Sequence, residues 1–147
     1  MALYTYGVHF LIKKGYTFMQ PPFFMKKSMM AKTAQLSDFD DQLYKVTGQK
    51  EDEDMYLIAT AEQPLSCLYE GEWLDPKELP IKLAGLSSCF RKEAGAHGKE
   101  TWGVFRVHQF EKVEQFLYTS PVFLNHRISV LLIHFNRKNH GKLMKKC

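Results

Sequence analysis

The feature that most constrains the fold is a pair of strand-like runs, residues 81–91 and 104–118, on either side of a segment with three glycines. Apolar and polar residues alternate along these runs, and successive side chains on a strand point to opposite faces. Glycines are common where a loop joins two strands. The pattern therefore predicts an antiparallel hairpin whose loop holds Gly95, Gly98 and Gly103.

The segments before this hairpin predict a series of short elements. Residues 2–14 have apolar residues near helical spacing, and Gly15 is a plausible end of that helix. We also expect a strand over 16–24 that closes at Pro21-Pro22, a helical or mixed stretch with core methionines over 25–46, a strand at 56–60 and a short helix over 61–74. Because strands and helices do not alternate regularly, the order favours an α+β fold, with an antiparallel sheet flanked by helices, over a doubly wound sheet.

The second strand-like run has two unlike faces. Its odd positions include the apolar residues Phe105, Val107, Val113 and Leu117. Its even positions carry cations, an aromatic ring and a carboxylate: Arg106, His108, Phe110, Lys112 and Glu114. One interpretation is a solvated outer face of a two-sided sheet. The other is a ligand platform, because a guanidinium matches phosphate oxygens and an aromatic ring offers a base a stacking surface.

The positive charge of the chain belongs to its last part. Residues 122–147 hold six Lys or Arg and no Asp or Glu, so only 14 of the 20 basic residues precede them, together with all 16 acidic ones. A nucleic-acid-binding function based on net charge would therefore depend on this basic tail alone, and it stays an alternative.

Cysteine content and hydropathy restrict the compartment. Cys67, Cys89 and Cys147 are odd in number and widely spaced, which argues for a reducing compartment and against a disulfide framework or structural zinc. No apolar run approaches the roughly 20 residues that span a bilayer, and the start shows no secretory signal pattern. We expect a cytoplasmic protein without a membrane partner and without a metal-ligand set of its own.

Three motifs, in the same order, resemble the seryl-tRNA synthetases of the eukaryotic cytosolic type, a family of class II aminoacyl-tRNA synthetases. The segment "GLSSCFRKEAGAHGKETWGVFRVHQFEKVEQF" is similar to their motif 2, "KGYTFMQPPFF" to their motif 1 and "YLIATAEQPL" to their serine-binding T-x-E segment. The resemblance covers residues 1–121. It implies a partial class II catalytic domain that dimerises through the motif 1 region, Lys14 to Phe24.

The resemblance also assigns roles to single residues. It implies that Arg91 holds the ATP α-phosphate and the serine carboxylate, and that Glu93 meets the adenine amino group; these two are the implied catalytic residues. Phe110 would stack on adenine, and Glu114 would read the serine hydroxyl. The implied ATP site also includes Lys92, Val107, His108 and Gln109. The implied serine site also includes Thr60, Ala61 and Glu62, with Thr60 and Glu62 around the serine amino group.

The implied reaction is attack of the serine carboxylate on the α-phosphate of ATP, followed by transfer of serine to tRNA(Ser). Mg²⁺ is expected for the family, but its ligands are not found in this chain. Residues 122–147 match no part of the family, so we expect an unrelated basic tail. Whether this tail is ordered or disordered is left open. Motif 3 is also not found. The alternative function is therefore a catalytically inactive, truncated fragment that binds ATP or serine weakly or mediates dimer interaction.

Overall fold

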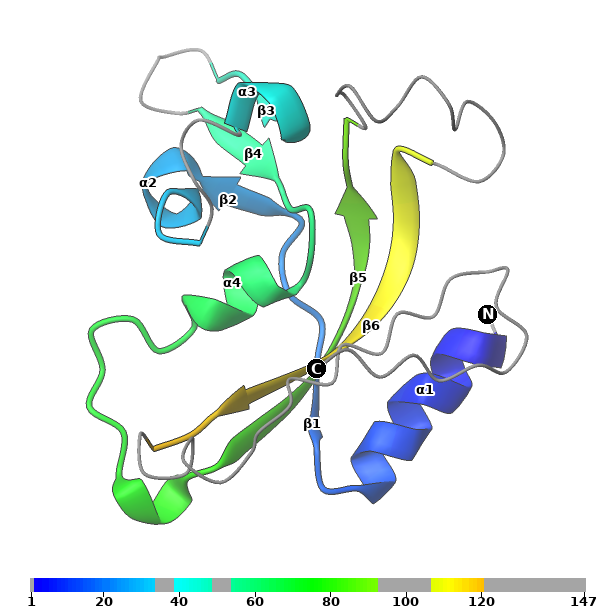
Figure 1. Cartoon of the computed structure of the whole chain (residues 1–147), viewed down its shortest axis with the longest axis vertical. Helices are drawn as coiled ribbons and strands as arrows, with labels where there is room; N and C mark the ends of the chain where they lie inside the picture. The colour runs from blue at the N-terminus through cyan, green and yellow to red at the C-terminus, as the bar shows by residue number, and fades with distance from the viewer. Residues whose placement is uncertain (1, 34–38, 49–53, 93–106, 121–147) are drawn as a thin grey trace.

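A long two-stranded ladder forms the centre of the molecule (Figure 1). The computed structural model describes residues 2–33, 39–48, 54–92 and 107–120. In it, β5 (Ile81–Phe90) and β6 (Gln109–Tyr118) pair antiparallel, from Ile81 opposite Tyr118 to Phe90 opposite Gln109. The predicted hairpin strands are confirmed. The second strand begins later than expected, and the expected loop glycines and residues 104–106 lie outside the described residues.

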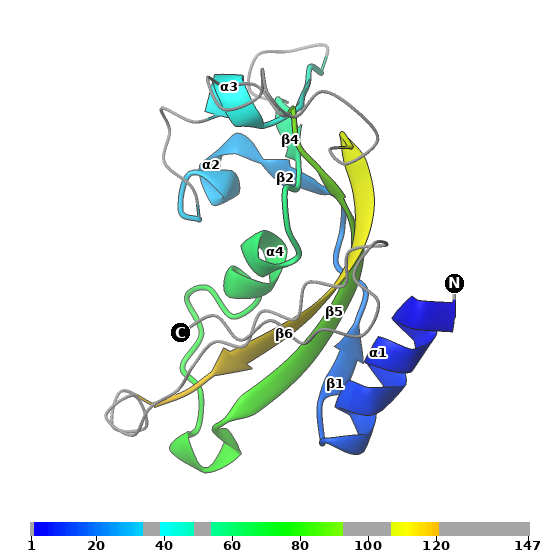
Figure 2. The same cartoon turned by 45° about the vertical axis from the view of Figure 1, so that its right-hand side comes forward.

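A third strand makes this sheet mixed. β1 (Thr17–Met19) pairs parallel with β5, with Thr17 opposite Leu83, and the strand order is β1-β5-β6. The alternation pattern predicts strands but not their partners, so the sequence did not show this parallel pair. The α+β class with a sheet flanked by helices is confirmed. Figure 2 shows α1 (Ala2–Lys13) and α4 (Glu62–Ser66) on opposite faces of the sheet.

Helix α1 ends where the sequence predicts. Gly15 has a φ of +80°, a left-handed conformation that glycine adopts without the Cβ penalty of other residues, and its N–H donates to Ile12 O at 2.9 Å. The buried side of α1, Val8 and Leu11, packs on Ala84 of β5 and Val113 of β6. The odd-numbered face of β6 thus meets α1 through Val113, as its pattern predicts.

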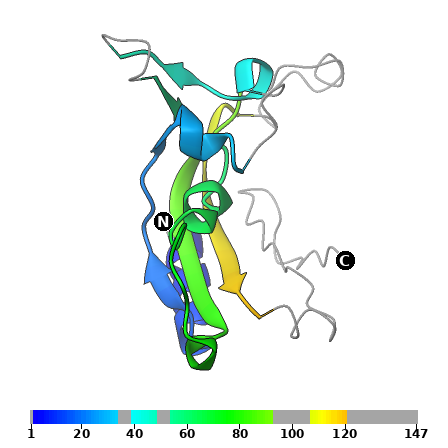
Figure 3. The same ribbon diagram turned by 90° about the vertical axis from the view of Figure 1, so that its left-hand side faces the viewer.

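A second, smaller sheet lies at one end of the main sheet (Figure 3). Its strands are β2 (Phe24–Lys26), β3 (Lys45–Val46) and β4 (Met55–Leu57), in the order β2-β4-β3 and all antiparallel. The short helices α2 (Lys27–Met30) and α3 (Phe39–Gln42) belong to the mixed stretch predicted over 25–46. Met25 and Met30 are buried in its core and Met29 packs against them, so the prediction of core methionines is confirmed.

One residue joins the two sheets through its backbone. Ile58, directly after β4, donates its N–H to Phe23 O and accepts from Phe90 N, each at 2.9 Å. The chain then turns into α4, which is shorter than the predicted helix. After Ser66 it continues through turns to Gly71, whose φ is +78°, and through a 3-10 helix (Pro76–Glu78) to β5. This path brings residues 59–62 against the polar face of β5 and β6.

Candidate serine and nucleotide site

The polar face of β6 is buried rather than solvated. Phe110, Lys112 and Glu114 alternate on one side of the strand, and the side chains of Lys112 and Glu114 are only 4% and 1% exposed. The interpretation of this face as a solvated rim is therefore wrong. Charged groups are costly to bury unless they are paired, so the partners of these two side chains define the site.

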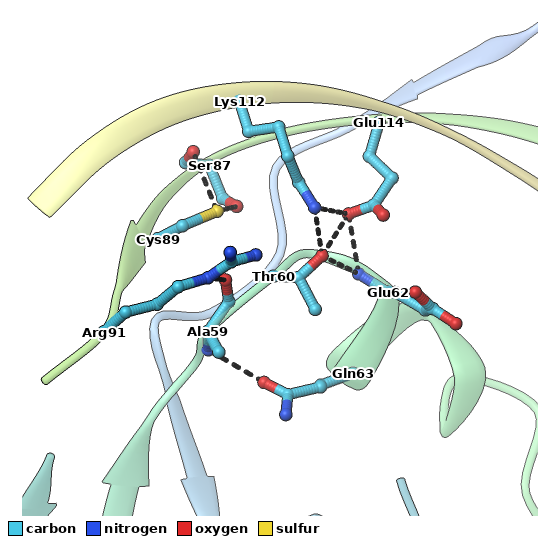
Figure 4. A network of polar contacts seen from close by, with 9 residues as sticks. All are labelled: Ala59, Thr60, Glu62, Gln63, Ser87, Cys89, Arg91, Lys112 and Glu114. Atoms are coloured by element: carbon cyan, nitrogen blue, oxygen red, sulfur yellow. Dashed lines mark hydrogen bonds and ion pairs between the residues drawn. The ribbon is translucent and has the colours of Figure 1, made fainter. Parts of the chain in front are cut away.

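One oxygen of Glu114 accepts three contacts (Figure 4). Its Oε2 lies 2.6 Å from Thr60 Oγ1, 2.9 Å from the backbone N of Glu62 and 2.9 Å from Lys112 Nζ. Its Oε1 is equally buried and has no hydrogen-bond partner within the described part of the chain. A buried acceptor without a donor carries an uncompensated desolvation cost. A donor brought by a ligand would remove that cost.

The T-x-E segment contributes through different atoms of its residues. Thr60 donates its hydroxyl to Glu114 and accepts from Lys112 Nζ and, at 3.4 Å, from Glu62 N. Glu62 reaches Glu114 through its backbone amide, and its own carboxylate points away (Figure 4). Ala61 is fully buried and precedes α4. The structure thus brings the predicted serine-site residues Thr60, Ala61, Glu62 and Glu114 together.

Close packing holds α4 against the sheet. Gly85 lies directly opposite Glu114 in the ladder, and a Cβ added there would be 2.9 Å from Leu65 Cδ1 and 3.2 Å from Ala61 Cβ. The Tyr118 hydroxyl donates to Leu65 O at the other end of the helix. The Gln63 side chain accepts from Ala59 N at 2.8 Å and fixes the turn before α4. The absence of a side chain at Gly85 lets α4 come close enough to deliver its first amide to Glu114.

Arg91 and Phe110 form the neighbouring part of the site. The Arg91 guanidinium carbon lies 5.2 Å from the centre of the Phe110 ring, and its Nε donates to Ala59 O at 3.4 Å. A cation over an aromatic ring is attracted by the ring's quadrupole. Arg91 therefore links Ala59, next to the Thr60 segment, with the aromatic ring, one face of which it covers. Glu93 and Arg106 lie outside the described residues.

The remaining predicted ATP-site residues lie where β5 and β6 meet the smaller sheet. Lys92 donates its backbone N–H to Gln42 O at 3.0 Å, and the His108 carbonyl accepts from Arg91 N at 2.9 Å. The His108 ring is 2.5 Å from Tyr44 Oη, which supports a structural hydrogen bond for this histidine. Val107 and His108 precede β6, and Gln109 is its first residue; all three are exposed.

A buried thiol lies on the same face. Cys89 is opposite Phe110 and fully buried, and burial raises the pKa of its thiol, an effect that Lys112 partly opposes. Within the described residues no group of three or more His, Cys, Asp or Glu could hold a metal ion. No helix of the described part of the chain is long and apolar enough to cross a membrane.

Sequence reasoning missed three residues of this site: Lys112, Gly85 and Gln63. Lys112 falls on the predicted polar face, but the family resemblance assigns it no role. Its signal was its spacing, because residues two apart on a strand share a face and Lys112 precedes Glu114 by two. Gly85 and Gln63 gave no usable signal, since their roles depend on how α4 meets β5.

Comparison with known proteins shows the family of the chain. Residues 44–132 match the family model of the tRNA synthetase class II core domain (G, H, P, S and T). The chain therefore belongs to this family of class II tRNA synthetases.

Its individual relatives are serine–tRNA ligases. The chain is 62% identical over 120 residues to the cytoplasmic serine–tRNA ligase of Arabidopsis thaliana, covering 82% of this chain and 26% of that protein. The crystal structure of the cytoplasmic serine–tRNA ligase of Naegleria fowleri in complex with AMP has a TM-score of 0.75 and 59% identity, over 82% of this chain and 27% of that one. Seryl-tRNA synthetase of Pyrococcus horikoshii complexed with ATP has a TM-score of 0.74 and 49% identity, over 82% and 26%. The chain thus spans about a quarter of the length of these relatives.

Proposed function

We propose that this chain forms the serine- and ATP-binding part of a serine–tRNA ligase, an ATP-dependent enzyme that makes seryl-adenylate and transfers serine to tRNA(Ser). The observation that carries the proposal is Glu114 Oε1, a buried carboxylate oxygen without a partner among the described residues. The relatives are serine–tRNA ligases, and a hydroxyl is the donor that serine has and alanine lacks.

In this proposal the serine hydroxyl donates to Glu114 Oε1. A site built around such an acceptor rejects alanine, because its buried oxygen would stay unpaired. The serine amino group would lie beside Thr60, Ala61 and Glu62. Because the Thr60 hydroxyl already donates to Glu114 and accepts from Lys112, we assign the contact with the amino group to other atoms of this segment.

The nucleotide would lie on the Arg91 side. Arg91 would hold the α-phosphate and the serine carboxylate and neutralise charge as the carboxylate attacks phosphorus and pyrophosphate leaves. This chemistry depends on positioning and charge neutralisation. Adenine would stack on the ring face of Phe110 that Arg91 leaves open, or replace Arg91 on the other. We assign further ATP contacts to Lys92, Glu93, Val107, His108 and Gln109.

The proposed dimer pairing, cellular location and metal requirement come from the relatives and from the family resemblance. Pairing with a second copy through Lys14 to Phe24 would cover Phe18 and Phe24, which are 42% and 45% exposed. We place the protein in the cytoplasm, because cytoplasmic serine–tRNA ligases are among its relatives. Mg²⁺ remains an expectation from the family resemblance, since the described residues show no ligand cluster for it.

The test is a calorimetric titration of the chain with L-serine and with L-alanine, in the wild type and in Glu114→Gln. We expect wild type to favour serine by at least about tenfold and Glu114→Gln to lose most of that preference, because its amide is a poorer acceptor than a carboxylate. Equal affinity of the wild type for both amino acids would refute the proposed function.

The second candidate is a binding module without turnover. It is favoured by one observation, the span of about a quarter of the relatives' length. Serine-dependent exchange of pyrophosphate into ATP separates the two candidates. Exchange that Arg91→Ala abolishes supports the ligase, whereas serine binding without exchange supports the binding module.

A further inference from the structure

Lys112 is a buried cation in contact with Glu114 and Thr60, and the proposed function gives it no role. Only 4% of its side chain is exposed. Its Nζ lies 2.9 Å from Glu114 Oε2 and also donates to Thr60 Oγ1. It therefore contacts both side chains that make up the polar floor of the serine site, and Figure 4 shows it above Thr60 and beside Glu114.

We propose that Lys112 is a positioning residue that sets the specificity for a hydroxyl-bearing amino acid. It holds Glu114 with Oε2 facing the protein, so that of the two carboxylate oxygens Oε1 is left to accept from the ligand. This inference rests on the proposed function, because the hydroxyl that Oε1 receives is that of serine.

The argument begins with hydrogen-bond capacity. Oε2 already accepts from Thr60, Glu62 and Lys112, which uses its lone pairs. The Thr60 oxygen accepts from Lys112 Nζ and from Glu62 N, and its one proton is donated to Oε2. Neither atom can therefore receive a ligand hydroxyl, and among the acceptors of this cluster discrimination depends on Oε1.

Charge gives the second step. A carboxylate buried to this degree requires a charged or strongly donating partner. Lys112 is the cation in contact with it, while Arg91 lies over Phe110 and donates to Ala59 O. The Cys89 thiol lies on the same face near Lys112, and the Glu62 carboxylate points away. Removing Lys112 leaves a buried anion held only by Thr60 and one amide, free to turn or to take up water.

The test compares Lys112→Met with Lys82→Met in the full chain. Methionine keeps an unbranched chain of similar length without the charge. Lys82 is the matched control, since it is on β5, loses the same charge and lies over the Tyr16 ring. Two readouts are measured: the ratio of serine to alanine affinity by calorimetry, and the amide resonance and hydrogen-exchange protection of Glu62 in the ligand-free protein.

We expect Lys112→Met to lower the serine-to-alanine affinity ratio at least about tenfold. Alanine affinity should stay within about twofold, and Glu62 amide protection should fall. Lys82→Met should keep both. Equal weakening of serine and alanine would indicate a structural role and overturn the inference, as would an unchanged ratio or an unchanged Glu62 amide. A wild type without serine preference would instead overturn the proposed function, and the inference with it.

Discussion

Gly85 permits the sharpest prediction about how this site is assembled. In Gly85→Ala the new Cβ would lie 2.9 Å from Leu65 Cδ1 and 3.2 Å from Ala61 Cβ, well inside the roughly 3.5–4.0 Å at which carbon atoms attract each other best. Leu65 and Ala61 are both buried, at 2% and 0% exposure. The Ala61 Cβ is fixed to the backbone and can yield only if the start of α4 shifts away from β5, and the buried Leu65 side chain must repack.

The expected magnitude follows from two opposing effects. Adding a methyl group to a close-packed interior costs about 1–3 kcal/mol. Replacing glycine recovers about 0.4–1 kcal/mol by restricting the unfolded chain. We expect Gly85→Ala to lower the free energy of unfolding by about 1–2 kcal/mol, measured by urea denaturation followed by far-ultraviolet circular dichroism. The displaced helix should also weaken the contact between the Glu62 amide and Glu114.

A second background identifies the cause. In Leu65→Ala the closest atom is gone, so Gly85→Ala should there cost less than about 0.5 kcal/mol or stabilise, because the methyl fills the space left. Gly71→Ala is the matched control, since Gly71 has a φ of +78° and nothing within 4 Å of an added Cβ. It should cost the same in both backgrounds through backbone strain. Equal cost of Gly85→Ala in both backgrounds would refute the packing argument.

Two further predictions concern other parts of the molecule. Burial covers the Cys89 thiol and raises its pKa, so little thiolate forms there below that raised pKa. Brief iodoacetamide treatment at pH 8 should therefore modify half-exposed Cys67 before Cys89, as read by peptide mass spectrometry. Equal labelling of these two cysteines in the native protein would contradict this prediction. Phe18→Glu should shift the chain from dimer to monomer in light scattering, because it places a charge in the proposed pairing surface. Trp73→Glu, at a fully exposed position, is the control and should leave the dimer intact. A wild type that is monomeric at tens of micromolar would count against the pairing.

The sequence alone was enough to predict the two strands of the hairpin and which of their residues share a face. Alternation in 81–91 and 104–118 predicted β5 and β6, since a strand's side chains change face at every residue. The same period placed Phe110, Lys112 and Glu114 on one face. Motif resemblance then assigned Arg91, Thr60 and Glu114 to one ligand site, and the structure brings them together.

Tertiary structure alone decided which way that face points and which atoms remain available. Alternation is equally compatible with a solvated and a buried polar face, and only the packing of α4 against Gly85 shows that Lys112 and Glu114 are buried. The parallel pairing of β1 with β5 was likewise hidden, because strand partners far apart in sequence leave no local pattern. The separation of Glu114 into one occupied and one available oxygen arises from three contacts, from Thr60, Glu62 and Lys112, that exist only once the chain is folded.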